Sequence, residues 1–452
     1  MSRGTCLDRM PEAIRQIIAR LNGRGYEAYV VGGCVRDALL GREPHDWDVC
    51  TSALPQEVVD SFPERTVHPT GIQHGTVLVS WEGEGVEITT FRTEGDYSDH
   101  RHPDRVTFVR SLEEDLSRRD FTVNAMAYHP ERGVTDPFGG QADLRSGLIR
   151  CVGDPVRRFQ EDGLRILRAL RFAARYGFAI EERTAKAMEE CRELLRWIAV
   201  ERIFQELKGI LCGAGTGELL RRHREIAAVC LPELRPAFDF EQHNPNHCYD
   251  VWEHTLHAVD NIAPDPVLRL AMLFHDIGKP ATFSLDENGV GHCYRHHLVS
   301  ARIAEDVLRR MRCDNETREA VVTLVDYHDR YRRFPRRTTG RLLSELGAER
   351  TRQLLQVIEA DIKAQNPDSV PMKMERLLEG YAMVEALLAA GSCLSVRDLA
   401  IGGRDLIALG GRPGVRFGQV LDALFRQVLD GTLENRREPL LAAAKVLLEE
   451  ES

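Results

Sequence analysis

The 452-residue sequence contains no Cys-x-x-Cys pair, although eleven cysteines are scattered along it. Such pairs are typical of zinc knuckles, and dense cysteine frameworks are typical of small secreted domains, so neither class is indicated. No apolar run approaches the length of a membrane span, and the N-terminus lacks the apolar core of a signal peptide. We therefore expect a cytoplasmic protein with no membrane partner.

The sequence also has no excess of positive charge, since its formal net charge is -10. This balance argues against indiscriminate nucleic-acid binding, but a local basic stripe can still bind phosphate on an acidic protein. The content of 43% hydrophobic and 29% charged residues is that of a globular protein. The length exceeds that of one compact core, so we expect three or four domains; the oligomeric state is left open.

A glycine-broken strand near the N-terminus gives the first chemical signal. The apolar residues 29–31 predict a buried strand, which Gly32 and Gly33 interrupt before Arg36 and Asp37 at a helix start. The turn leaves backbone N–H groups free for an anion near a helix N-terminus, and Arg36 adds positive charge. The sequence therefore predicts a phosphate-binding turn.

A carboxylate pair follows within the segment Asp46-Trp-Asp48-Val49, which predicts a strand over residues 47–50. Because strand side chains alternate between faces, Asp46 and Asp48 share one face about 7 Å apart. Two such carboxylates repel each other unless a divalent cation lies between them. Either motif alone is usually an ordinary turn or loop, but the two in this order indicate nucleotidyl transfer.

Periodicity predicts a helix over residues 12–22 and a small mixed sheet covered by helices. The predicted strands are 27–31, 47–50, 76–81, 86–91 and 106–109. Glu87 alternates with apolar neighbours, so it is either an exposed strand residue or a third carboxylate that activates the attacking hydroxyl. Residues 93–105 are polar and rich in turn formers, which predicts a mobile loop beside the site.

Two arginine-rich segments come next. Arg118 and Arg119 precede an apolar stretch that ends at Asn124; they either cap a helix or neutralise triphosphate charge, with Asn124 ordering the ribose. Residues 157–175 predict one long helix in which Arg165, Arg168, Arg171 and Arg175 fall within about 120° of one another. Such a stripe is commonly just an exposed face, with Glu161 and Arg165 as a surface pair. Its buried flank would consist of Ile166, Leu167, Leu170 and Ala174.

Asp162 stands one turn before Arg165, and this arrangement favours a functional role for the arginine stripe. A carboxylate accepts from an exocyclic amino group, and a guanidinium donates to a neighbouring ring nitrogen. Cytosine and adenine offer this pattern, whereas uracil and guanine reverse it and would leave buried polar groups unpaired. The pair Asp162 and Arg165 therefore predicts selection of CTP and ATP.

These motifs together resemble the class II, bacterial-type CCA-adding tRNA nucleotidyltransferases and poly(A) polymerases of the polymerase β-like superfamily. The resemblance rests on Gly-Gly-x-Val-Arg-Asp37, Asp-x-Asp48, Arg-Arg-Asp-Phe-Thr-x-Asn124 and Glu-Asp-x-x-Arg165. It implies an α+β fold with a nucleotidyltransferase head and small mixed sheet, followed by an all-helical neck, an HD body and a tail. The implied domains are residues 1–145, 146–235, 236–365 and 366–452.

The family resemblance also implies an activity and site residues. The activity is template-independent addition of CCA to the tRNA 3′ end from CTP and ATP, with two Mg²⁺ ions held by Asp46 and Asp48. A flexible loop at residues 93–105 supports A addition, which weighs against an enzyme that adds only C. The implied nucleotide contacts are Gly32, Gly33, Arg36, Arg119 (with Arg118 as second candidate), Asp162, Arg165, Arg168 and Arg171.

A second cluster of chemistry lies further along, because eight of the sixteen histidines fall between His243 and His297. His275-Asp276 after an apolar helix resembles the HD-domain signature, in which histidines and aspartates bind a divalent metal and hydrolyse phosphate esters. Some relatives keep this fold mainly as an RNA-supporting body. The ligands of a second metal site would be His254, His275, Asp276 and Asp361, with His296 and His328 as alternates.

Three other functions stay open on this sequence. An A-adding enzyme that works with a separate CC-adding partner would share every motif, and a poly(A) polymerase would share the head. A metal phosphohydrolase centred on the histidines is the third. The glycine-rich segments 402–406 and 410–418 either contact tRNA phosphates or link helices.

Overall fold

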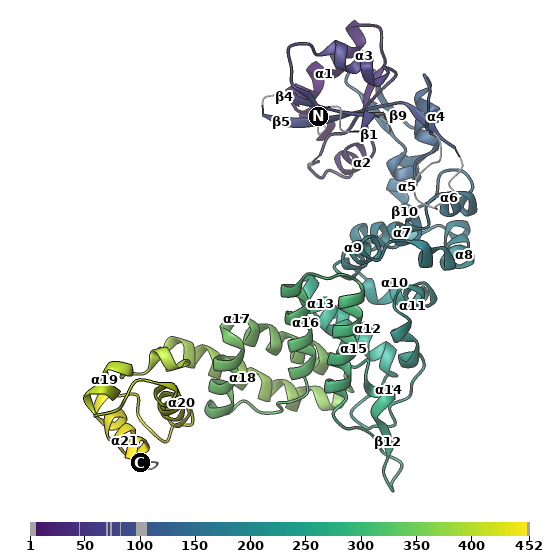
Figure 1. The fold of residues 1–452 in the computed structure, drawn as a ribbon. Coiled ribbons are helices and arrows are strands. Elements are labelled where there is room, and N and C mark those ends of the chain that lie inside the picture. Colours follow the sequence, from purple (N-terminus) through teal and green to yellow (C-terminus); the bar gives the residue numbers. More distant parts are fainter. Residues whose placement is uncertain are drawn as a thin grey trace, which may run out of the picture. The chain divides into compact units, whose positions relative to one another are not determined.

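The computed structural model describes residues 6–44, 46–68, 71–72, 75–81, 83–95 and 106–449. The chain forms two compact units, Met1–Pro232 and Glu233–Ser452 (Figure 1). The predicted α+β class, with a small mixed sheet followed by helices, is confirmed. The four predicted domain ranges stay predictions.

A seven-stranded mixed sheet lies in the first unit, with the strand order β3-β4-β5-β2-β1-β8-β9. Its pairs are antiparallel except that β2 runs parallel to β5, with Val49 opposite Ile88. A separate pair joins β6 and β7. The strands are β1 (Ala28–Val31), β2 (Val49–Thr51), β3 (Val67–His68), β4 (Thr76–Trp81), β5 (Glu84–Thr90), β6 (Arg92–Glu94), β7 (Val106–Phe108), β8 (Ala127–His129) and β9 (Gly133–Thr135).

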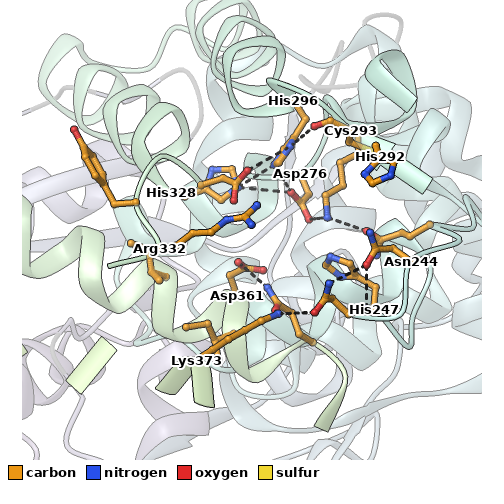
Figure 2. A pocket seen from close by; sticks show the side chains of 18 of the residues that line it. Asn244, His247, Asp276, His292, Cys293, His296, His328, Arg332, Asp361 and Lys373 are labelled. Atoms are coloured by element: carbon orange, nitrogen blue, oxygen red, sulfur yellow. Dashed lines mark hydrogen bonds and ion pairs between the residues drawn. The ribbon is translucent and has the colours of Figure 1, made fainter. Parts of the chain in front are cut away.

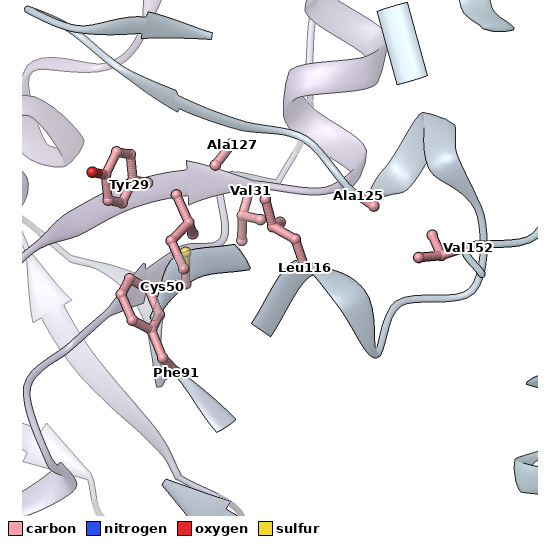
Figure 3. Close-up of a cluster of buried hydrophobic side chains, with 9 residues drawn as sticks. Tyr29, Val31, Cys50, Phe91, Leu116, Ala125, Ala127 and Val152 are labelled. Carbon is pink, nitrogen blue, oxygen red and sulfur yellow. The ribbon is translucent and has the colours of Figure 1, made fainter. Parts of the chain in front are cut away.

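A buried apolar cluster fixes the strands that carry the first motif. Tyr29 and Val31 of β1 pack with Cys50 of β2, Phe91 and Leu116 (Figure 3). Each fully buried side chain of this size contributes about 1.5–3 kcal/mol, so the ends of β1 and β2 are held firmly in place. Gly32 and Asp48 adjoin these strands, so the packing of the cluster also fixes the backbone at these two residues.

Helices make up most of the rest of the first unit. The earlier helices cover the sheet, and the later ones follow it in the chain. They are α1 (Glu12–Gly23), α2 (Gly33–Leu39), α3 (Pro55–Ser61), α4 (Leu112–Ser117), α5 (Gly140–Ser146), α6 (Pro155–Glu161), α7 (Leu164–Tyr176), α8 (Glu182–Cys191), α9 (Val200–Leu211), α10 (Thr216–Arg222) and α11 (Arg224–Cys230). Short 3₁₀ segments, η3 (Thr122–Asn124) and η4 (Arg192–Trp197), and the parallel strands β10 (Leu148–Ile149) and β11 (Ala179–Ile180) connect them.

The second unit is helical apart from one hairpin, formed by β12 (Phe283–Leu285) and β13 (Gly291–Cys293). Its helices are α12 (Val251–Asp260), α13 (Pro266–Phe274), α14 (Lys279–Thr282), α15 (His296–Arg310), α16 (Asn315–Tyr327), α17 (Arg336–Lys363), α18 (Val370–Ala389), α19 (Gly403–Ala408), α20 (Val415–Leu429) and α21 (Arg437–Glu449). A kink at Gly347, which has φ +75°, divides α17. None of the helices in the described ranges is long and apolar enough to cross a membrane.

Several local predictions need correction. Strand β2 begins at Val49, two residues later than predicted, and the short strands β3, β6, β8 and β9 were not predicted. Residues 93 and 94 of the predicted loop at 93–105 belong to strand β6, and residues 96–105 lie outside the described part of the chain. Short strands give little periodic signal, since two or three residues cannot establish an alternation.

Candidate active site and a second histidine cluster

The turn after β1 is shaped by a glycine that no other residue could replace without strain. Gly32 has φ +83°, and its N–H donates to the carbonyl of Met126 at 3.1 Å. A Cβ on Gly32 would lie 2.9 Å from Nη1 of Arg119. Nε of Arg119 is buried with no hydrogen-bond partner among the described residues. Arg119, a predicted nucleotide contact, therefore lies against the predicted phosphate turn, and its Nε–H is an unused hydrogen-bond donor.

Arg36 lies in the interior rather than on the open face of the turn. It is 5% exposed, and its Nη1 donates to Oδ1 of Asn124 at 2.5 Å. Its guanidinium also packs over the rings of Phe172 and Tyr176, 5.1 and 5.0 Å from their centroids. Arg36 thus connects α2 to α7, and its contact with a nucleotide stays a prediction.

Asp37 also takes part in the connection between α2 and α7. Its Oδ1 accepts from Nε of Arg36 and from the hydroxyl of Tyr176, both at 2.9 Å. Burial opposes ionisation of Asp37, but the hydrogen bonds and charge of Arg36 outweigh it and lower the pKa of this carboxyl.

Two carboxylates lie just before β2, and a third lies in the middle of the neighbouring strand β5. Asp46 and Asp48 lie in the segment just before β2 and are solvent-exposed, and the carbonyl of Asp48 accepts from the N–H of Val31 at 3.0 Å. The β2–β5 register, extended by one residue, places Asp48 beside Glu87. Desolvation and the negative charges of Glu87 and Asp46 raise the pKa of Asp48, against the opposing charge of Arg119. Mutually repelling carboxylates of this kind fit a divalent cation.

Asp120 is a central residue that the sequence interpretation missed. It is 8% exposed; its Oδ1 accepts from Nδ2 of Asn124 at 3.0 Å, and its Oδ2 accepts from Nε and Nη2 of Arg168 at 2.9 and 2.7 Å. Burial alone would raise its pKa, but Arg168 and Asn124 lower it to about 2. The available signal was an acid that follows two arginines and precedes an apolar run, a pattern that suits a buried ion pair.

The helix predicted over residues 157–175 is wrong, because it is two helices. Asp162 is extended, with φ -142° and ψ 105°, and separates α6 from α7. Its Oδ1 accepts from the N–H of Leu164 at 3.0 Å, a local bond that competes with helical pairing. The neighbouring Gly163 packs tightly, since a Cβ there would lie 3.0 Å from Cβ of Leu194.

The two proposed base-reading groups are held by other residues in this structure. Oδ2 of Asp162 accepts from Nη2 of Arg202 at 3.0 Å. Nη1 of Arg165 donates to Oε2 of Glu161 at 2.7 Å, and its Nη2 donates to the carbonyl of Arg118 at 3.2 Å. Asp162 and Arg165 therefore adjoin the same helix start, each with defined partners.

The arginines of α7 do not form a plain exposed face. The side chains of Arg165, Arg168 and Arg171 are 11%, 35% and 20% exposed. Nε of Arg171 donates to Oε2 of Glu206 at 2.6 Å, and its guanidinium lies 4.4 Å from the ring centroid of Phe172. The predicted buried flank is confirmed, since Ile166, Leu167, Leu170 and Ala174 are all buried.

The second unit brings the predicted histidine cluster together. His254 lies on α12, His275 and Asp276 directly follow α13, and Asp361 lies on α17. Nε2 of His254 lies 3.2 Å from Nε2 of His275 and 3.0 Å from Oδ1 of Asp361. One ligand atom from each of these four residues fits within 4.8 Å of the others, a spacing that suits one metal ion.

The predicted alternates His296 and His328 form a second group with Asp276 rather than replacing members of the first. Nε2 of His296 lies 3.1 Å from Oδ1 of Asp276, and Nε2 of His328 lies 3.7 Å from the same oxygen. Oδ2 of Asp276 instead faces His254, at 3.2 Å. Asp276 thus belongs to both groups, one on each of its oxygens. Figure 2 shows Asp276 together with His296, His328 and Asp361.

Asp276, Asp361, His296 and His328 line a cavity of about 490 Å³, whereas His254 and His275 are fully buried beside it. Cationic side chains line its wall, including Lys279, whose Nζ lies 2.6 Å from Oδ2 of Asp276, and Arg332 and Lys373 (Figure 2). Burial opposes the charged form of His254, but the carboxylates of Asp276 and Asp361 raise its pKa to about 9. A cluster that holds cationic imidazolium beside carboxylates has the charge balance that a metal ion would replace.

Family models match three stretches of the chain. Residues 28–150 match the Poly A polymerase head domain. Residues 177–238 match a model described as "Probable RNA and SrmB- binding site of polymerase A", and residues 294–444 match tRNA nucleotidyltransferase domain 2.

Curated relatives match about half of the chain. The CCA-adding enzyme of Geobacillus thermodenitrificans is 53% identical over 204 residues, which cover 45% of this chain and 50% of the relative. The CCA-adding enzyme of Pediococcus pentosaceus is 48% identical over 227 residues, which cover 50% of this chain and 56% of the relative. The match thus spans about half the length of these relatives.

Solved structures extend the similarity to nearly the whole chain. The Bacillus stearothermophilus CCA-adding enzyme in complex with CTP is 30% identical with a TM-score of 0.71, and the match covers 96% of each chain. The Thermotoga maritima CCA-adding enzyme complexed with tRNA_CCA has a TM-score of 0.57 at 21% identity, which shows a shared fold.

Proposed function

Because the chain belongs to the CCA-adding enzyme family, we propose that it adds the 3′-terminal CCA to tRNA from CTP and ATP and releases pyrophosphate. One observation carries this proposal. A chain of polar contacts, Arg36–Asn124–Asp120–Arg168, joins the predicted phosphate turn at the start of α2 to the arginine helix α7, and its first three members are buried. This connection supports the proposal because it would hold a triphosphate site at the turn and a base site on α7 at a fixed distance from each other.

Nucleotidyltransferases of this family use divalent metal, and we propose Mg²⁺ held by Asp46 and Asp48. When bound, the metal would lower the pKa of the tRNA 3′-hydroxyl and stabilise the leaving pyrophosphate. Glu87 lies beside this pair and would take the hydroxyl proton. Arg119, with its unpartnered Nε, would donate to a phosphate oxygen close to the Gly32 turn.

The base would be read at the start of α7. Asp162 would accept from the amino group of cytosine or adenine, and Arg165 would donate to the adjacent ring nitrogen. Arg168 and Arg171 would support the nucleotide from the next two turns. The bound CTP of the Bacillus stearothermophilus relative favours a nucleotide site in the matched part of this chain.

Stepwise addition to defined tRNAs tests the proposal. The purified protein is incubated with Mg²⁺ and tRNAs that end before CCA, after C, and after CC, with one nucleotide at a time. We expect C on the first two substrates and A on the third. Addition of A alone would identify an A-adding enzyme, and long A tracts would identify a poly(A) polymerase; either result would overturn the proposal.

A second function is favoured by the histidine cluster. We propose that His254, His275, Asp276 and Asp361 bind a divalent metal and that the cationic cavity binds a phosphate ester for hydrolysis. The supporting observation is that four potential ligand atoms lie within 4.8 Å of one another and that two of these residues, Asp276 and Asp361, line a cavity of about 490 Å³.

Metal titration and a generic phosphodiester test this second function separately from the first. The His275→Ala variant should lose binding of Mn²⁺ or Ni²⁺ measured by calorimetry and lose hydrolysis of bis-p-nitrophenyl phosphate. Its CCA addition should be unaffected, and Asp48→Ala should show the reverse pattern. Equal metal binding by wild type and His275→Ala would contradict the assignment.

A further inference from the structure

Arg202 contacts the residue that we propose reads the amino group of the base. It lies in the first turn of α9, and its Nη2 donates to Oδ2 of Asp162 at 3.0 Å. The two side chains are 28% and 16% exposed, so the pair is largely removed from solvent. The sequence gives no hint of this contact, because forty residues separate the partners.

Helix α9 is firmly seated against α7, so the position of Arg202 is well defined. Ile203, Phe204 and Leu207 of α9 are buried. One turn after Arg202, Glu206 accepts from Nε of Arg171 at 2.6 Å. The two helices approach so closely at Gly209 that a Cβ there would lie 2.5 Å from Cδ of Arg171. Arg202 is therefore carried by a rigid element rather than by a loop.

The carboxylate of Asp162 is fixed through both of its oxygens. Oδ1 accepts from the N–H of Leu164, and Oδ2 accepts from Arg202. The χ2 torsion of aspartate is otherwise broad and roughly two-fold, so one bond alone would let the carboxylate turn. Two bonds on different oxygens fix its plane and direct the remaining lone pairs. An acceptor with a fixed direction is what distinguishes an amino group from a carbonyl oxygen.

The other terminal nitrogen of Arg202 provides a further argument. Its Nη1 is buried and has no hydrogen-bond partner among the described residues. Leaving a buried donor unpaired is unfavourable, so local stability alone does not explain an arginine at this position. The hydrogen bond from Arg202 to Asp162 explains why an arginine stands at this position.

We propose that Arg202 is a specificity-determining positioning residue, which holds the Asp162 carboxylate as a fixed acceptor and thereby enforces the choice of CTP and ATP over UTP and GTP. The inference rests on the proposed CCA addition. Arg202 acts through Asp162, so its loss would affect the choice between bases more than the rate with the correct ones.

The test is single-nucleotide addition by Arg202→Met, measured as kcat/KM for each of the four nucleotides on tRNAs that lack CCA or end in CC. We expect the CTP/UTP and ATP/GTP ratios to fall by about tenfold or more, as for the loss of an oriented hydrogen-bonding group. Arg202→Lys keeps a cationic donor and should recover part of both ratios. Arg196→Met is the matched control, because Arg196 pairs with Glu193 at the surface of η4 with 66% of its side chain exposed; its ratios should equal those of wild type.

A double variant decides whether Arg202 acts through Asp162. In an Asp162→Ala background, Arg202→Met should produce no further loss of selectivity. An equal loss of rate with all four nucleotides, or a further loss of selectivity in the double variant, would overturn the inference. Failure of the wild type to add C or A would instead reject the proposed function, so the two failures are distinguishable.

Discussion

The carboxylate of Asp120 accepts two hydrogen bonds from the guanidinium of Arg168, at 2.9 and 2.7 Å. Forty-eight residues separate the two, and their contact fixes α7 to the segment that follows α4. Through Asn124, the same carboxylate reaches Arg36 at the phosphate turn. The proposed base-reading helix α7 and the proposed catalytic turn are thus linked by one buried carboxylate.

Replacing Asp120 should lower the stability of the fold and remove part of its dependence on acid pH. The pKa of Asp120 is lowered to about 2 in the folded protein from an ordinary value of 3.8. A carboxyl with a lowered pKa stabilises the fold fully above its unfolded pKa and loses this effect as the pH falls through its folded pKa. We expect wild type to exceed Asp120→Asn in stability by about 2 kcal/mol at pH 6, a difference that shrinks between pH 4 and pH 2.

Urea unfolding followed by circular dichroism at several pH values measures this difference. The exposed residue Asp60 on α3 provides the control, since Asp60→Asn should barely move the midpoint at any pH. A stability gap between wild type and Asp120→Asn that is constant from pH 6 to pH 2 would show that ionisation of Asp120 is not its source.

Gly32→Ala should weaken nucleotide binding beyond the effect of backbone strain. Alanine is strained at the φ of +83° that Gly32 adopts. Its Cβ would also lie 2.9 Å from Nη1 of Arg119, which is too close, so the guanidinium would have to move. We expect the KM for CTP to rise by about tenfold, the range for losing one charge-assisted hydrogen bond. Gly25→Ala separates the two effects, because Gly25 has φ +89° and a Cβ added there would meet no atom within 4 Å. Equal KM values for the two variants would refute a role for Arg119 at this turn.

Loss of the carboxylate pair should abolish catalysis without unfolding the protein. Asp46 and Asp48 are exposed, so the double alanine variant should retain the wild-type circular dichroism spectrum and melting temperature. It should add no detectable C or A to tRNA in a gel assay, because nothing would hold the metal. Asp60→Ala should retain full activity. Robust addition by the double variant would disprove the mechanism.

Asp162→Ala should relax the choice of nucleotide. Without an acceptor for the amino group, CTP and ATP lose their advantage over UTP and GTP, and the ratios of kcat/KM should fall by about tenfold or more. The measurement is incorporation of each nucleotide alone onto tRNA that ends in CC or lacks CCA. Unchanged ratios would show that the base is selected elsewhere.

Local features were predictable wherever the signal is contained in a few neighbouring residues. The strand at β4 matches its predicted bounds of 76–81, and the helix predicted at residues 12–22 is α1. His275-Asp276 lies at a helix end, as predicted. The break at Asp162 was missed although it is also local, because the regular spacing of arginines and apolar residues continues across it and hides Gly163.

The sequence by itself determined the turn at Gly32, the carboxylates of Asp46 and Asp48, and the types of chemistry available, since turn geometry and side-chain type depend on adjacent residues. Only the tertiary structure decided which groups hold one another. In the folded chain Arg36 is buried, Asp120 pairs with Arg168, and Arg202 pairs with Asp162. The six predicted histidine and aspartate ligands form two groups that share Asp276. The physical reason is that a buried charge must find a partner, and packing brings that partner from distant positions in the chain.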